Sequence, residues 1–74
     1  MAETIRPHIE VENDGIIVTL PGTTFRVIYR KTKYLQLVTF DFRGDKDAGM
    51  PLADFLARAW RVANDKAREL GWIV

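Results

Sequence analysis

The spacing of apolar residues changes once along this chain, at Pro51, and this change limits the fold more than any other feature of the sequence. Before Pro51 apolar and polar residues alternate, as in HIEVENDGIIVTL over residues 8–20, which is typical of strands with one buried face. After Pro51 apolar residues recur every three or four positions, which predicts one amphipathic helix. The sequence therefore predicts an α+β fold, in which an antiparallel meander of four strands, or of three main strands, packs against a single long C-terminal α-helix.

Three turns determine the predicted register of the sheet. Asn-Asp-Gly at 13–15 is a strong hairpin signal, because glycine accepts the positive φ of a tight turn, and a two-residue loop at Asp14-Gly15 places Val11 opposite Val18. Pro-Gly at 21–22 predicts the second turn, and a four-residue tip at 30–33 forms the third. Loops of even length keep the alternation in step between strands. The side chains then expected to face the helix from the last two strands are Phe25, Val27, Tyr29, Val38, Phe40 and Phe42.

The predicted helix begins and ends at residues that favour helix termini. Pro51 suits the first helical position, Asp54 complements the positive end of the helix dipole, and Gly71 marks the C-terminal stop. Trp60 lies at the flank of the apolar stripe, where it is expected to seal the edge, and Trp72 is expected to fold back on the last turn. The apolar stripe consists of Leu52, Phe55, Leu56, Ala59, Val62, Ala63, Ala67 and Leu70.

One helix covers one face of a sheet, so the opposite face, called the open face below, is expected to be available to a partner. Aliphatic side chains among arginines are common in protein interfaces, and a small domain gains stability by burying them. We therefore expect a non-catalytic binding or self-association module that pairs with a second copy, as a homodimer, or with another protein. The residues of this predicted interaction face are Ile17, Arg26, Ile28, Arg30, Leu35 and Leu37.

A basic stretch, TTFRVIYRKTKY at 23–34, supports an alternative function, because it contains four bases and no acid. Arg26, Arg30, Lys31 and Lys33 are candidate phosphate contacts of a nucleic-acid-binding domain that uses the hairpin tip, with Tyr34 near enough to stack on a base. A sequence pI of about 8.1 and the acids of the first strand weigh against this interpretation. A second alternative is a small globular domain without a separable site, whose arginine and lysine stems only shield the sheet.

Composition bounds the organisation of the chain. Its 74 residues predict one domain, residues 1–74, with an N-terminal tail at 1–7 and a polar loop at 44–50 before the helix. Cysteine is absent, which excludes disulfides and thiolate metal sites. No secretory signal and no apolar stretch of about 20 residues is present, so we expect a cytoplasmic protein without a membrane partner.

Signals of catalysis or metal binding are weak. His8 is the only histidine, and without serine or cysteine the common nucleophile and base arrangements cannot form within one chain. The three acids Asp41, Asp45 and Asp47 suggest a calcium loop, but the EF-hand spacing fails, because Met50 and Leu56 stand where it needs glycine and glutamate. We therefore expect no enzyme activity and no cofactor.

Overall fold

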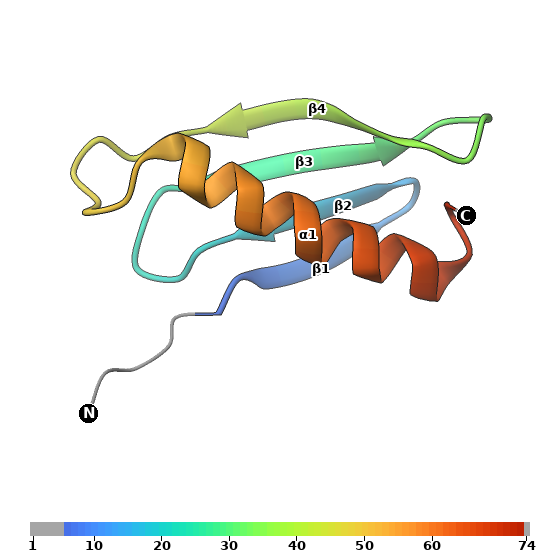
Figure 1. Cartoon of the computed structure of the whole chain (residues 1–74), viewed down its shortest axis with the longest axis horizontal. Helices are drawn as coiled ribbons and strands as arrows, with labels where there is room; N and C mark the ends of the chain where they lie inside the picture. Colours follow the sequence, from blue (N-terminus) through green and yellow to red (C-terminus); the bar gives the residue numbers. More distant parts are fainter. Residues whose placement is uncertain (1–5, 74) are drawn as a thin grey trace.

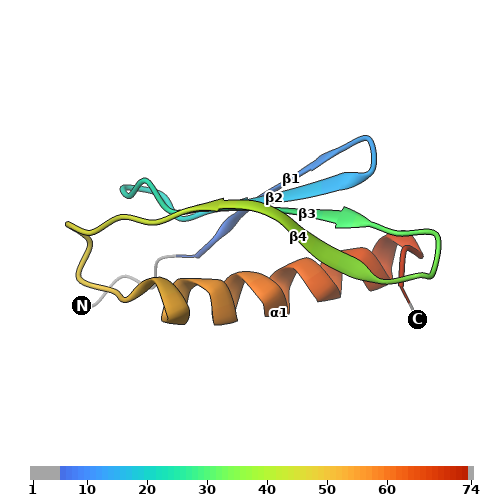
Figure 2. The same cartoon turned by 90° about the horizontal axis from the view of Figure 1, so that it is seen from above.

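The computed structural model describes residues 6–73 and confirms the predicted α+β fold. Its sheet is an antiparallel meander in the order β1-β2-β3-β4, with α1 across one face (Figures 1 and 2). The elements are β1 (His8–Glu12), β2 (Gly15–Thr19), β3 (Arg26–Lys31), β4 (Leu37–Arg43) and α1 (Leu52–Leu70). Residues 1–5 of the predicted tail lie outside the described residues. No helix within residues 6–73 is long and apolar enough to cross a membrane.

The β1–β2 hairpin turns one residue earlier than predicted. Its two-residue loop is Asn13-Asp14, with Glu12 opposite Gly15, and Val11 therefore faces Ile16 rather than Val18. Asn13 adopts the positive φ (49°) that we expected of the glycine, because asparagine tolerates the left-handed region. The pairing differs from the predicted one by two residues, and each side chain of the hairpin therefore stays on its predicted face.

The core lies between α1 and the two central strands. Phe25, just before β3, stacks on Phe55 of α1 with ring centroids 4.7 Å apart and an interplanar angle of 11°. Farther along the helix the buried positions are all alanines, whose small side chains let the helix backbone approach the sheet closely. The fully or nearly fully buried residues are Ile16, Val18, Leu20, Phe25, Val27, Tyr29, Leu37, Phe55, Ala59, Ala63 and Ala67.

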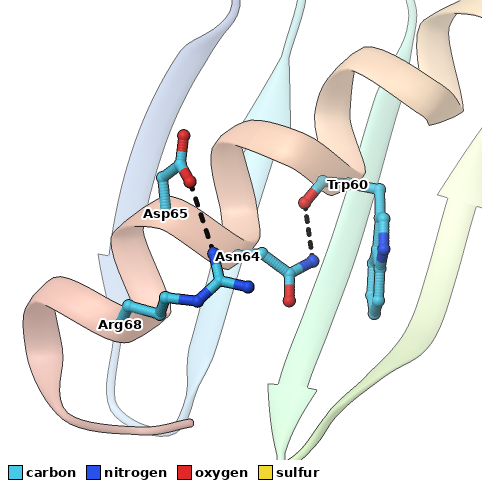
Figure 3. Close-up of polar contacts among 4 residues, drawn as sticks. All are labelled: Trp60, Asn64, Asp65 and Arg68. Atoms are coloured by element: carbon cyan, nitrogen blue, oxygen red, sulfur yellow. Dashed lines mark hydrogen bonds and ion pairs between the residues drawn. The ribbon is translucent and has the colours of Figure 1, made fainter. Parts of the chain in front are cut away.

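Trp60 occupies the flank of α1, as predicted, and closes the side of the core over β3. Its ring meets Tyr29 edge to face, with centroids 5.4 Å apart, while 46% of the residue stays exposed. Figure 3 shows the polar contacts beside it: the Asn64 amide donates to the Trp60 carbonyl (2.7 Å), and Arg68 pairs with Asp65 (3.4 Å).

The two ends of α1 follow the predicted signals closely. Pro51 is the N-cap residue, one position before the predicted one, and its carbonyl accepts the backbone N–H groups of Asp54 and Phe55. Gly71 ends the helix in the left-handed conformation (φ 78°), and its N–H donates to the Arg68 carbonyl. The N–H of Trp72 returns to the Ala67 carbonyl (2.8 Å), which confirms that Trp72 folds back.

The β3–β4 hairpin departs from the predicted register, because its loop has three residues at 33–35 instead of four residues at 30–33. Thr32 donates its N–H to the Gln36 carbonyl (2.8 Å), and Leu35 takes the left-handed conformation (φ 60°) that such loops place at their last residue. Leu37 therefore stands opposite Lys31, faces α1 and is buried in the core. The prediction that Leu35 and Leu37 lie on the open face is wrong.

A β-bulge in β4 restores the predicted facing of the side chains beyond Phe40, although the strand pairing stays six residues from the predicted one. Tyr29 pairs with Thr39, but its neighbour Ile28 pairs with Asp41, so Phe40 is the extra residue. The two bulged residues of a strand point to similar sides, which places Phe40 and Asp41 together on the open face. Past the bulge Phe42 stands opposite Val27 and lies on the helix side, the face predicted for it, but it is half exposed. The expectation that Val38 and Phe40 are buried under the helix is wrong, since both are exposed.

Candidate interaction surface

The open face has an apolar centre that is partly shielded from water. Its centre is a cross-strand pair, Ile17 of β2 and Ile28 of β3, and no described element covers it (Figure 2). Ile17 is nevertheless only 9% exposed, and Arg26 and Arg30 flank Ile28 along β3. Long arginine stems shield aliphatic side chains in this way. Four of the six predicted interaction residues thus meet here, whereas Leu35 lies in the hairpin tip and Leu37 in the core.

The largest run of exposed apolar side chains follows β4, which is an edge strand of the sheet (Figure 1). Val38, Phe40 and Phe42 are 46%, 57% and 52% exposed. Natural proteins usually avoid long apolar edges, because an unpaired edge attracts another strand. The sequence contained this signal in the alternation of LVTFDF, but the assumed even loop assigned all three residues to the core.

The Phe40 ring lies on the open face beneath an arginine. The guanidinium carbon of Arg30 is 3.9 Å from the centroid of the Phe40 ring, close enough for a cation–π interaction. Arg30 of β3 and Phe40 of β4 thus contact each other on the open face. We use the name β4 surface for the open-face residues Ile28, Arg30, Val38 and Phe40 together with Phe42, which lies on the helix side of the same edge strand.

Phe42 has its backbone N–H on the free edge of β4, as the hydrogen bonds of β3 show. The Lys31 N–H donates to the Asp14 carbonyl (3.0 Å), so Arg30 and Ile28 direct their backbone groups toward β4. By the same alternation Phe42 directs its N–H and C=O away from β3, to the free edge. The Phe42 N–H is occupied by Oδ1 of Asp41 (2.9 Å), which protects the edge locally.

Charge is divided across the open face. Glu10 and Glu12 of β1 lie at one edge, and Arg43 of β4 stands directly opposite Arg26 near the other. Like charges in directly opposed positions destabilise a sheet. Among residues 6–73 no carboxylate pairs with either arginine within 4 Å, and Asp41 has no basic partner. The two arginines and Asp41 therefore share one side of this face without forming an ion pair within the described chain.

The four predicted phosphate contacts do not form one cluster. Arg26 and Arg30 lie on the open face, whereas Lys31 faces the helix side, with its Nζ 5.1 Å from the Trp72 ring centroid and 3.7 Å from the Asp14 carboxylate. Lys33 lies in the tip with its Nζ 5.2 Å from the Tyr34 ring centroid. The structure thus brings Lys31 and Lys33 near two aromatic rings, but on a different side from the two arginines.

The polar loop before α1 is held by hydrogen bonds around Asp45. Its carboxylate accepts the backbone N–H groups of Thr24 (2.9 Å) and Asp47 (3.0 Å), and these bonds lower the pKa of Asp45. A wide hollow of about 880 Å³ opens beside this loop. Within the described chain no three His, Cys, Asp or Glu side chains gather as metal ligands. His8 is exposed and lies 3.3 Å from Glu10.

Comparison of the chain with protein-family models, curated proteins and solved structures finds no match.

Proposed function

We propose that this protein is a non-catalytic self-association module that uses the β4 surface. The observation that carries the proposal is the run of half-exposed Val38, Phe40 and Phe42 on an unpaired edge strand. Burying such side chains against a partner removes apolar area from water at about 25 cal/mol per Å². A domain of 74 residues, whose own core is small, benefits from that burial.

Sedimentation equilibrium from low to high micromolar protein tests this proposal. We expect concentration-dependent dimerisation, and Phe40→Thr should weaken it, because Phe40 belongs to both the open face and the edge strand. Val11→Thr is the matched control, since Val11 is a comparably exposed apolar residue on the opposite edge strand, β1. A wild-type protein that stays monomeric throughout would overturn the proposal and favour a domain without a separable site.

Nucleic-acid binding at the hairpin tip is a second candidate function. It is supported by Lys33 beside the exposed ring of Tyr34 and by Lys31 beside Trp72, since basic side chains and aromatic rings together are typical of single-strand binding sites. We expect any such binding to weaken steeply with salt, and replacing Lys31 and Lys33 together by glutamine should abolish it. Fluorescence anisotropy with a labelled single-stranded oligonucleotide provides the measurement. Absence of binding at low salt would remove this candidate.

A further inference from the structure

We infer that β4 pairs with β4 of a second copy, antiparallel, about a two-fold axis that passes through Phe42. This inference rests on the proposed function and specifies its partner and its register. In this register Asp41 of each chain stands opposite Arg43 of the other, and the two Phe42 residues stand opposite each other. The sheet becomes continuous through both chains, and both α1 helices lie on the same face of it, because the axis is perpendicular to the sheet.

The backbone of β4 supports this register. Phe42 directs its N–H and C=O to the free edge, so two Phe42 residues related by the axis can exchange both hydrogen bonds, as antiparallel hydrogen-bonded pairs do. The Phe42 N–H then leaves the Asp41 carboxylate, which now holds it at 2.9 Å. The released carboxylate lies on the open face, on the same side as Arg43, since Asp41 and Arg43 are two positions apart in a regular strand.

The charges of β4 select the same register. Arg43 stands opposite Arg26 in its own sheet and has no acidic partner within the described residues, and Asp41 has no basic one. In the dimer about Phe42, Asp41 of each chain stands opposite Arg43 of the other, so both residues gain a partner of opposite charge in each chain. An axis through Asp41 or through Arg43 would instead oppose two like charges.

The bulge excludes longer pairings. An axis through Phe40 would oppose Val38, which lies on the open face, to Phe42 of the second copy, which lies on the helix side. Residues directly opposed in a sheet must share a face, so that pairing fails. The favoured contact is consequently short, from Phe40 to Gly44, and the dimer should be concentration-dependent rather than permanent.

Charge reversal tests the register. Asp41→Arg alone sets two arginines opposite each other in both symmetry-related pairs, and Arg43→Asp alone opposes two aspartates, so each should raise the dimer dissociation constant by about tenfold. Both side chains are exposed, and Arg43→Asp places an acid opposite Arg26, so the monomers should stay folded. Circular dichroism and thermal midpoints check this.

Two complementary samples make the test decisive. An equimolar mixture of Asp41→Arg and Arg43→Asp chains should form a heterodimer, because every opposed pair then has opposite charges, and the double variant Asp41→Arg/Arg43→Asp should recover the homodimer. The Phe42 amide should also become protected from hydrogen exchange as protein concentration rises. Single variants that dimerise like the wild type, or a mixture that stays monomeric, would overturn the inferred register.

Failure of this inference can be distinguished from failure of the proposed function. If the charge variants dimerise normally while Ile28→Glu or Phe40→Thr dissociates the dimer, self-association stands and occurs through the open face. If the wild-type protein shows no dimer, both the inferred register and the proposed self-association are overturned.

Discussion

The Thr24 backbone N–H donates to the Asp45 carboxylate (2.9 Å), and the Thr24 hydroxyl donates to the Gly44 carbonyl (2.9 Å). These two bonds connect the turn before β3 to the loop after β4, across 21 and 20 residues of sequence. The Asp45 carboxylate also accepts the Asp47 N–H, so one side chain organises the loop that leads into α1.

Asp45 should make the fold sensitive to acid. Its pKa is lowered in the folded protein, first by the Thr24 N–H and then by the Asp47 N–H, so its contribution to stability is present above the unfolded-state pKa and is lost as pH falls through the folded-state pKa. We expect Asp45→Asn to flatten the acid limb of the stability profile, measured by urea unfolding at several pH values. Asp47→Asn is the control, and an equal effect of both variants would contradict this role.

Tyr29 should limit stability in base. Burial raises its pKa to about 12, so the folded state keeps the phenol neutral while the unfolded chain ionises above its ordinary value of about 10. The contribution of Tyr29 ionisation equilibria to the free energy of unfolding is therefore full below pH 10 and declines as pH rises toward 12. Tyr29→Phe should reduce this alkaline loss in urea unfolding, whereas Tyr34→Phe, at an exposed position, should leave it unchanged. Identical profiles for the two variants would refute the assignment.

The alanine contacts of α1 leave little room for larger side chains. Ala63 is fully buried, so Ala63→Leu should lower the free energy of unfolding by about 1–3 kcal/mol through overpacking. Ala57 lies on the exposed side of the same helix, and Ala57→Leu should change it by less than about 0.5 kcal/mol. Urea denaturation provides both values, and equal effects would show that the helix tolerates a larger separation from the sheet.

Leu35 holds a left-handed backbone conformation that costs a residue with a Cβ about 1–2 kcal/mol. Leu35→Asn and Leu35→Gly should each stabilise the protein, by roughly 0.5–1 kcal/mol after the greater chain entropy of glycine is included. Tyr34→Gly, one residue earlier, should instead destabilise it. Thermal unfolding measures these changes, and destabilisation by both Leu35 variants would show that the Leu35 side chain contributes more than its backbone costs.

The elements with strong local signals were predictable from sequence. The helix stripe, the left-handed Gly71 and the helix-facing Val18, Val27 and Tyr29 all follow from periodicity and turn chemistry, and the structure confirms them. The β1–β2 register was missed by two residues, because Asn13 and Gly15 can both supply a positive φ and the sequence does not choose between them.

The candidate site was less predictable, because it depends on loop length. Residues 32–36 contain neither glycine nor asparagine, so nothing in them indicates that Leu35 turns left-handed or that the loop is odd. No sequence feature indicates the bulge at Phe40 either, since it depends on how the two strands align. The exposed aromatic residues of β4 therefore became visible only in three dimensions.

The three-residue loop and the bulge offset each other, because the pairs from Ile28–Asp41 onward would be the same in a straight strand that follows a four-residue loop at 33–36. The two arrangements differ only in the stretch between the tip and Asp41. Sliding that stretch by one position would exchange Leu37 for Val38 and Phe40 beneath α1, while both ends of the hairpin stayed in place. The few residues between the tip and Asp41 thus decide whether aromatic or aliphatic side chains of this strand are exposed.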